Sequence, residues 1–438
     1  MIKAEVFANK DYYLIDITKN LLPDNIELSP GTYEIFELEL AVCEYNSLTE
    51  DGLIKRGAYF KSVNGRYTNH YILCASSNEA IHDKKSIRAK SFFRANRFST
   101  GYATHSLFPY RGKFHPQLIK AIMNLIKIPE NGLLLDPMAG SGTALLEAQL
   151  IGINSIGIDV SPFCKLMGEA KSKALTINLN AFANLLEYHN ELLNFLLKKN
   201  GKEKFIEKSK GKKWRNSATD DEIGNLYDVI LLAFLDAVGY TRRQSSKTLK
   251  ELFPEVLRRY FYTIESFHKV QKKLNLKLGN LTYKVGSVCD LPLTSESVDG
   301  IITSPPYSFA IDYVENDRPQ LEYLGIDVHE LKKQMLGLVG KGKKEKIRIY
   351  FEQMEKAIAE MYRVLKPGKL CVIIVGSNDI QTGGIRIEDE LIKLGIKAGF
   401  MPIRKMPKSI KGIQNSMTEE YILFLQKPNK SCKEREEG

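Results

Sequence analysis

The stretch DPMAGSGTALLEA, residues 136–148, predicts the turn from which the fold can be worked out. The apolar run GLLLDP that leads into it is typical of a short buried strand, and TALLEAQLIG predicts a helix that ends at Gly152. Glycines in such a turn let the backbone approach a ligand and place N–H groups at a helix N-terminus. A tight turn also uses glycine for structural reasons alone, so this stretch by itself is weak evidence for a ligand site.

The sequence on both sides continues the alternation of strands and helices. SIGIDV is the next predicted strand, and later strands are predicted for KVGSVCD, VDGIITS, KLCVIIVGS and EEYILFLQK, with FEQMEKAIAEMYRVL as a helix. Apolar strands that alternate with helices favour a largely parallel, doubly wound α/β sheet of the Rossmann-like kind.

A carboxylate strengthens the case for a ligand at the glycine turn. Asp159 ends the strand after the turn, where a carboxylate can hold the hydroxyls of a ribose. The turn does not read GxGxxG, which disfavours a dinucleotide. The pattern therefore indicates a cofactor that contains a single nucleoside.

Composition describes an ordinary globular protein with an excess of positive charge. The 438 residues are 43% hydrophobic and 26% charged, with a net charge of +11. That excess favours a polyanionic partner, although a lysine-rich coding bias would produce it as well. The six cysteines have no metal-ligand or disulfide spacing, and neither a signal peptide nor a membrane-spanning run is evident. We expect a cytoplasmic protein without a metal site.

The chain divides into regions of different character. About 120 residues separate the second and third predicted strands of the sheet, too many for one crossover, and indicate an inserted helical subdomain. In the N-terminal region TYEIFELELAVCEY and NHYILCAS resemble strands. The predicted regions are an α+β accessory region (1–95), a cofactor-binding half (96–175), a basic helical insertion (176–280), a catalytic half (281–427) and a disordered tail (428–438).

The insertion contains the most cationic stretch of the chain. Residues 198–215 hold nine Lys or Arg and two Glu around Trp214, and are predicted to be mobile. Residues 239–248, GYTRRQSSKT, mix cations with small hydroxyl residues, a composition that suits phosphate contacts. A solvated linker for the first stretch and a helix N-terminus for the second are equally good interpretations. The candidate nucleic-acid contacts are Lys212, Lys213, Arg215, Arg242, Arg243 and Lys247.

Residues 303–307, TSPPY, end another apolar strand with two prolines and a tyrosine. A strand-terminating turn is one explanation. However, DPMAGSGT followed downstream by TSPPY resembles the amino-group DNA methyltransferases that use S-adenosylmethionine, in the branch whose cofactor motifs precede the catalytic loop. The family usually has Phe where this chain has Met138, a change that keeps the position large and apolar.

The resemblance implies a set of cofactor contacts. HSLFPYRGKFHPQLI, residues 105–119, is similar to the family segment that closes over the methionine end of the cofactor, and Asp290 matches the residue that takes the adenine amino group. The implied cofactor-binding residues are Lys113, Phe114, Asp136, Met138, Gly140, Ser141, Gly142, Thr143, Asp159 and Asp290.

The catalytic loop of the family reads [D/N/S]-P-P-[Y/F], which Ser304, Pro305, Pro306 and Tyr307 match. An exocyclic amine is a poor nucleophile because its lone pair is delocalised into the base. Acceptors for its N–H groups, here the Ser304 hydroxyl and the Pro305 carbonyl, draw the nitrogen toward a geometry with a usable lone pair. Pro306 holds that carbonyl outward, and Tyr307 offers a face on which a flipped base can stack.

Serine at the first loop position is, by resemblance, the usual signature of cytosine-N4 enzymes, whereas Asp or Asn marks adenine-N6. Methylation at C5 needs a cysteine nucleophile, which this loop lacks. The expected reaction is methylation of cytosine N4 in duplex DNA, and a cognate restriction endonuclease is a further partner that the resemblance suggests. Adenine-N6 methylation, methylation of an exocyclic amine in RNA, and a catalytically silent nucleic-acid-binding protein are the alternatives.

Two further segments are near the expected active site. After the loop, Asp312, Tyr313, Asp317 and Arg318 could order it, touch the target, or begin a capped helix. Near the C-terminus, one of Asn415 and Ser416 is a candidate to face the base pocket.

Overall fold

A computed structural model describes the following parts of the chain: residues 20–32, 34–76, 101–110, 112–242, 247–306, 312–377, 384–409 and 419–429. The predicted tail lies outside them from residue 430 onward, as do Asn415 and Ser416.

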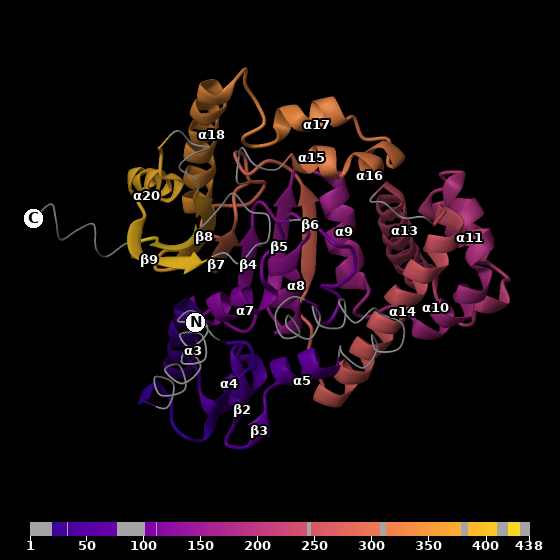
Figure 1. The fold of residues 1–438 in the computed structure, drawn as a ribbon, viewed down its shortest axis with the longest axis horizontal. Helices are drawn as coiled ribbons and strands as arrows, with labels where there is room; N and C mark the ends of the chain where they lie inside the picture. The colour runs from indigo at the N-terminus through magenta and orange to yellow at the C-terminus, as the bar shows by residue number, and fades with distance from the viewer. Residues whose placement is uncertain are drawn as a thin grey trace, which may run out of the picture.

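Seven of the described strands form one central sheet in the order β6-β5-β4-β7-β8-β10-β9 (Figure 1). β6, β5, β4, β7 and β8 are parallel neighbours, and β10 runs antiparallel between β8 and β9. This arrangement confirms the predicted doubly wound, Rossmann-like α/β sheet. The strands are β4 (Leu133–Asp136), β5 (Asn154–Asp159), β6 (Leu281–Val285), β7 (Gly300–Thr303), β8 (Leu370–Ser377), β9 (Met401–Ser409) and β10 (Glu419–Gln426).

The strand order reverses at β4, which pairs with β5 on one side and with β7 on the other. Parallel strands place their carboxyl ends at the same edge of the sheet, and a reversal of order opens a crevice there. Asp136, Asp159 and Thr303 are the last residues of β4, β5 and β7. The glycine turn and the proline corner therefore leave neighbouring strands at the same edge.

Helices cover both faces of the sheet. α7 (Pro116–Leu125) and α8 (Thr143–Leu150) pack on the face that carries Leu134 and Ile302. α18 (Lys343–Val364) and α20 (Ile387–Ala398) pack on the face that carries Leu135 and Ile301. Successive strand residues point to opposite faces, and burying one such side chain contributes about 1.5–3 kcal/mol. The two apolar layers hold the strand ends in place.

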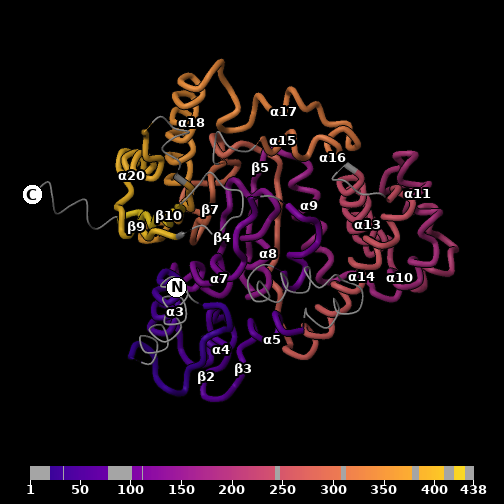
Figure 2. Tube along the Cα trace, viewed as in Figure 1, coloured from indigo at the N-terminus to yellow at the C-terminus, as the bar shows by residue number. Residues whose placement is uncertain are grey.

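The insertion between β5 and β6 is helical, as the sequence predicts. It follows α9 (Pro162–Lys173) and lies at the opposite end of the molecule from α18 and α20 (Figure 2). Its helices are α10 (Leu179–Leu185), α11 (His189–Leu197), α12 (Lys202–Ser209), α13 (Asp220–Arg242) and α14 (Leu249–Leu274), with short 3-10 turns at Leu186–Tyr188 and Lys213–Arg215. The boundaries of the predicted domains stay predictions.

The expectation that residues 198–215 are mobile is wrong. Much of the segment is helical, and Trp214 is only 6% exposed, with its ring stacked on Phe205 at 5.7 Å between centroids. The aromatic side chains pack into the insertion core, while most lysines extend outward from it, which lysine stems permit. A high density of lysine therefore accompanies an ordered segment here.

α13 is long and apolar enough to cross a membrane by length and composition. However, 83% of its most apolar window is buried inside the protein, as expected for a central core helix.

The N-terminal region combines helices and strands, but two of its segments are helices where the sequence suggested strands. TYEIFELELAVCEY forms most of α3 (Ile35–Ser47), and NHYILCAS forms α5 (Asn69–Ser76). The alternation of Ile, Phe, Glu and Leu imitated a strand, yet α3 starts with a capping box between Glu34 and Glu37 and buries Phe36 and Leu40 one turn apart. The other elements are α4 (Glu50–Arg56) and the strands β1 (Ile26–Leu28), β2 (Phe60–Val63) and β3 (Arg66–Tyr67).

A buried carboxylate joins this region to the central domain. Glu44 of α3 accepts hydrogen bonds from the Ala58 N–H at 3.0 Å and from the Asn124 side-chain amide of α7 at 2.6 Å. Burial raises the pKa of Glu44 to about 7. The hydrogen bond from the Asn124 amide therefore offsets part of the energetic cost of burying the Glu44 carboxylate.

We expect Asn124→Ala to lower the free energy of unfolding by about 1–3 kcal/mol, because it leaves Glu44 buried without its amide donor. Denaturant unfolding measures the change. Asn46→Ala is the matched control, since Asn46 lies on α3 but donates to the Val42 carbonyl on the surface. Equal effects of the two substitutions would contradict the role given to Asn124.

Candidate active site

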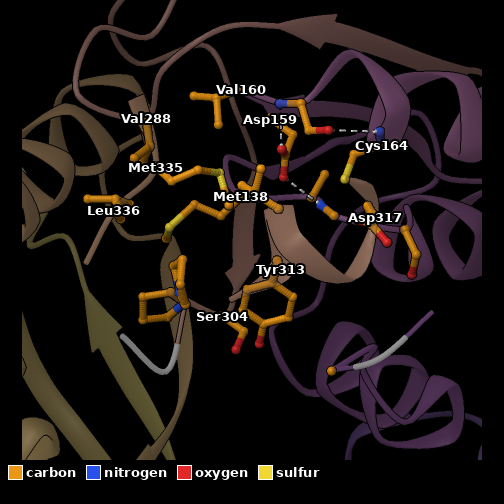
Figure 3. Close-up of a pocket in the computed structure, with 18 of the residues that line it drawn as sticks. Met138, Asp159, Val160, Cys164, Val288, Ser304, Tyr313, Asp317, Met335 and Leu336 are labelled. Carbon is orange, nitrogen blue, oxygen red and sulfur yellow. Dashed lines mark hydrogen bonds between the residues drawn. The ribbon is translucent and has the colours of Figure 1, made fainter. Parts of the chain in front are cut away.

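A cavity lies at the carboxyl ends of β4, β5 and β7 (Figure 3). Its wall combines the glycine turn, the proline corner, Tyr110 and residues 112–114 before α7, and a segment further along the chain that begins at Tyr313. Predicted site residues that meet on this wall are Lys113, Phe114, Met138, Gly140, Ser141, Thr143, Asp159, Ser304, Pro305 and Pro306.

The glycine turn adopts the left-handed conformation that glycine favours. Gly140 has φ 49° and Gly142 has φ 75°, and Gly142 is the N-cap of α8. A Cβ on Gly142 would lie 3.1 Å from the Cα of Gly168, so this glycine also lets α8 approach α9. Gly142 is not on the cavity wall. Its role is to shape the turn whose other residues line the cavity.

Asp159 fixes the glycine turn from the end of β5. One carboxylate oxygen accepts from the Gly140 N–H at 2.9 Å, and the other accepts from the Ser161 N–H at 2.9 Å (Figure 3). Burial raises the pKa of this carboxyl, and the two backbone bonds oppose the rise. The carboxylate still faces the cavity, so the predicted ribose contact stays a prediction beside this observed structural role.

Asp136 connects two strands instead of lining the cavity. It is fully buried and accepts hydrogen bonds from the Thr303 hydroxyl at 2.9 Å and from the Met138 N–H at 3.3 Å. Burial raises its pKa to about 7. The structure does not bring this residue to the cofactor cavity, because its side chain is directed toward β7.

Asp290, the predicted adenine contact, is exposed and is not on the cavity wall. The predicted strand KVGSVCD is too long at its C-terminal end, since β6 stops at Val285. Gly286, Ser287 and Val288 reach the cavity in its place. The contact of Asp290 with adenine therefore has no support from its position.

The proline corner is where the sequence places it. Ser304 is half-buried and Pro305 is buried, and both line the cavity with Pro306 directly after β7. Tyr307 lies outside the described residues.

Residues 312–336 form a roof over the cavity, and its helices are α15 (Tyr313–Asn316), α16 (Arg318–Tyr323) and α17 (Val328–Gln334). Tyr313 and Asp317 line the cavity. Asp312 instead caps α15, accepting from the Glu315 N–H at 2.9 Å, and pairs with Lys332 at 2.7 Å. Arg318 also has a structural role, since it pairs with Glu315.

Several cavity residues carry no sequence signal that would have identified them. Met335 and Leu336 come after α17 and meet Val160 and Val288 at the apolar end of the cavity (Figure 3). Tyr110 has its ring nearly parallel to that of Tyr313, at 16° and 6.4 Å between centroids. These contacts depend on packing between elements that are distant in sequence.

The insertion supports this roof. The Gln320 amide donates to the Leu235 carbonyl of α13 at 3.1 Å, and the Tyr323 hydroxyl donates to the Leu196 carbonyl of α11 at 2.7 Å. The inserted helices thus help to form the cavity.

Acidic side chains pair with three of the residues that are predicted to contact nucleic acid. Lys212 lies 3.7 Å from Glu191, Arg215 pairs with Asp220, and Lys247 lies 2.5 Å from Glu255. Lys213 is exposed. The side chain of Arg242 and all of Arg243 lie outside the described residues. Their contact with nucleic acid stays a prediction.

The two ends of the cavity differ in polarity, which suits S-adenosylmethionine. Val160, Val288 and Leu336 provide apolar surface of the kind that an adenine ring packs against. Lys113 and Asp317 provide charges for an amino acid, and burial lowers the pKa of Lys113 to about 8. The described residues contain no cluster of His, Cys, Asp or Glu that could hold a metal ion.

Comparison with known families agrees with this geometry. Residues 298–437 match the N6/N4 methyltransferase model, described as a DNA methylase, and residues 106–204 match an RMKL-like methyltransferase domain. Residues 298–437 are thus similar to the N6/N4 DNA methylases. The resemblance to amino-group DNA methyltransferases is thereby confirmed, and the match does not distinguish the N4 from the N6 branch.

Two relatives of the chain are methyltransferases with different names. The chain is 25% identical over 329 residues to the type II methyltransferase M.BsoBI of Geobacillus stearothermophilus, and this match covers 62% of this chain and 64% of that protein. The chain thus spans just under two thirds of that relative. It is also 26% identical over 199 residues to a tRNA (guanine(10)-N2)-dimethyltransferase of Methanocaldococcus jannaschii, covering 45% of this chain and 48% of that protein.

Among solved structures, a SAM-dependent methyltransferase from Methanosarcina mazei covers 69% of this chain and 95% of its own, at 12% identity and a TM-score of 0.31. The fold assignment rests on the strand order described above and not on this alignment.

We expect Asp159→Asn to weaken the binding of S-adenosylhomocysteine about tenfold or more, because an amide cannot accept from both backbone N–H groups with equal strength. Isothermal titration calorimetry measures the affinity. Glu169→Gln on α9 is the control, since among the described residues Glu169 pairs with two lysines of its own helix, at 3.7 and 3.8 Å, and is not on the cavity wall. Unchanged affinity in Asp159→Asn would show that the turn does not need this carboxylate.

Proposed function

We propose that the protein transfers a methyl group from S-adenosylmethionine to the exocyclic N4 amine of a flipped-out cytosine in duplex DNA. The observation that carries the proposal is the position of Ser304, Pro305 and Pro306 on the same cavity wall as the glycine turn. A cofactor held by the turn would then lie beside the acceptor groups of the corner. The match of the catalytic half to a DNA methylase model supports DNA as the substrate.

The corner activates the amine by accepting its hydrogens. When bound, S-adenosylmethionine supplies an electrophilic methyl group on a sulfonium. The Ser304 hydroxyl and the Pro305 carbonyl accept N–H bonds, which directs the nitrogen lone pair away from the ring and toward that carbon. A nitrogen–carbon bond forms, the carbon–sulfur bond breaks with its electrons left on sulfur, and the methylated amine releases one proton to water. A strong general base is not required.

Cytosine is favoured over adenine by a single residue, Ser304. In adenine-N6 enzymes of this family an Asp or Asn occupies the corresponding place, and this chain has neither. The choice of base therefore depends on one hydroxyl group, and N6 of adenine is the nearest alternative.

A second candidate function is methylation of an exocyclic amine in RNA. The tRNA (guanine(10)-N2)-dimethyltransferase relative and the match to the RMKL-like domain favour it. DNA is the better supported substrate because the M.BsoBI match covers more of the chain and the DNA methylase model matches the catalytic half.

A methyltransferase that protects one DNA sequence would accompany a restriction endonuclease specific for the same sequence. The DNA substrate also suggests a cytoplasmic protein. Within the described parts of the chain no disulfide joins Cys43, Cys74, Cys164, Cys289 or Cys371, as suits a reducing compartment.

The direct test supplies labelled S-adenosylmethionine together with duplex DNA or tRNA, followed by digestion to nucleosides. We expect label in N4-methylcytosine from DNA. Label in N6-methyladenine would overturn the choice of base, and label confined to tRNA would overturn the substrate class.

We expect Ser304→Ala to lower kcat/KM for DNA about 100-fold, while the affinity for S-adenosylhomocysteine stays unchanged. The variant loses one of the two groups that accept hydrogen bonds from the amine, and it keeps the other, the Pro305 carbonyl. Ser297→Ala is the control at the other end of β7, where the Ser297 hydroxyl donates to the Thr294 carbonyl. A variant at Ser304 that lost cofactor affinity instead would show that the corner is misassigned.

A further inference from the structure

A second lysine lies behind the glycine turn, and no predicted role accounts for it. Lys171 of α9 is only 3% exposed. Its ammonium group donates to the Ser141 carbonyl over a long 3.5 Å, and within the described ranges it forms no ion pair. Burying an ammonium group without an opposite charge is unfavourable, so such a group indicates an anion that arrives with a ligand.

Lys171 interacts electrostatically with Lys113, the lysine on the cavity wall. The ammonium group of Lys113 donates to the His105 carbonyl at 3.2 Å. Burial, together with the charge of Lys113, lowers the pKa of Lys171 to about 7. The two positive groups are therefore near enough to repel each other in the absence of an anion.

Hydroxyl groups and a helix start complete the surroundings. Ser141 and Thr143 line the cavity, and their hydroxyl oxygens are 3.2 Å apart. They flank Gly142, the N-cap of α8, which offers no side chain to the N–H groups of the first turn. A helix N-terminus favours a negative charge, and here it coincides with two lysines.

We propose that Lys171 and Lys113 together form a subsite for the carboxylate at the amino-acid end of the cofactor, with Lys171 acting from behind Ser141. The inference rests on the proposed use of S-adenosylmethionine and adds a residue that no family motif marks. Lys113 faces the carboxylate directly. Lys171 is a positioning residue that holds the Ser141 carbonyl and supplies the second positive charge.

The other groups around Lys171 keep a constant charge near neutral pH. Burial lowers the pKa of His105 to about 4 and raises the pKa of the Cys164 thiol, so both are neutral between about pH 6 and 8. Asp236 forms an ion pair with Arg259. Changes in this range therefore come from the two lysines.

Ligand affinity at this subsite should decrease as the pH rises. In the ligand-free protein Lys171 loses its proton as the pH rises through its pKa of about 7, and a carboxylate binds the protonated form. The affinity for S-adenosylhomocysteine should fall between about pH 6 and 8, with proton uptake on binding at the upper end. 5′-Methylthioadenosine, which lacks the amino-acid end, should show no such dependence.

The test compares the two ligands by calorimetry in wild type and in Lys171→Met. We expect the variant to bind S-adenosylhomocysteine about 10- to 100-fold more weakly and 5′-methylthioadenosine within about twofold of wild type. Because the substitution removes a buried unpaired charge, the ligand-free variant should melt at the same temperature as wild type or higher. Lys171→Arg keeps the charge and should retain part of the affinity.

Lys165→Met is the matched control on the same helix, since Lys165 is 39% exposed and lies 3.7 Å from Glu169. It should leave both affinities unchanged. An equal loss for both ligands in Lys171→Met would mean that the lysine only shapes the glycine turn, and unchanged affinity for both would mean that it has no role; either result overturns the subsite. Wild-type protein that binds neither ligand would overturn the proposed function and the subsite with it.

Discussion

The hydrogen bond from Thr303 to Asp136 joins the ends of β4 and β7, and the rest of the site depends on this junction. The glycine turn leaves one of these strands and the proline corner leaves the other. Because paired strands lie about 4.8 Å apart, the distance between the cofactor turn and the acceptor groups is set largely by the sheet. The bond is buried, so water does not compete with it, and both apolar layers of the sheet support the strands that it connects.

The second requirement is a roof, which the sheet cannot provide. Residues 312–336 close the cavity, and the insertion holds them through hydrogen bonds to the carbonyls of Leu196 and Leu235. One apolar cluster runs from α9 through the inserted helices to α17, so the insertion and the roof share a core. An inserted segment of this kind therefore contributes to the cofactor cavity as well as to any contact with the target.

Sequence alone was sufficient for six of the seven strands and for the two turns on the cavity wall, because buried strands are apolar runs and the turns at their ends carry glycine or proline. It missed β9 (Met401–Ser409), whose residues are mostly exposed and form no apolar run. It failed at 35–47, where alternating Ile, Phe, Glu and Leu satisfied both periods and the cap at Glu34 decided for a helix. It also placed Asp136 and Asp159 at strand ends without showing whether their oxygens face a ligand or a neighbouring donor. Met335, Leu336 and Lys171 reach the site only through tertiary packing, which leaves no local pattern.

The central claim is that the corner after β7 presents an exocyclic amine in DNA to the cofactor. The most direct test is to express the chain in a bacterial host that lacks DNA methyltransferases and to measure modified nucleosides in its genomic DNA by mass spectrometry. The account predicts N4-methylcytosine with the wild-type chain and almost none with Ser304→Ala. Methylation at C5 of cytosine, or an equal yield from both chains, would contradict it.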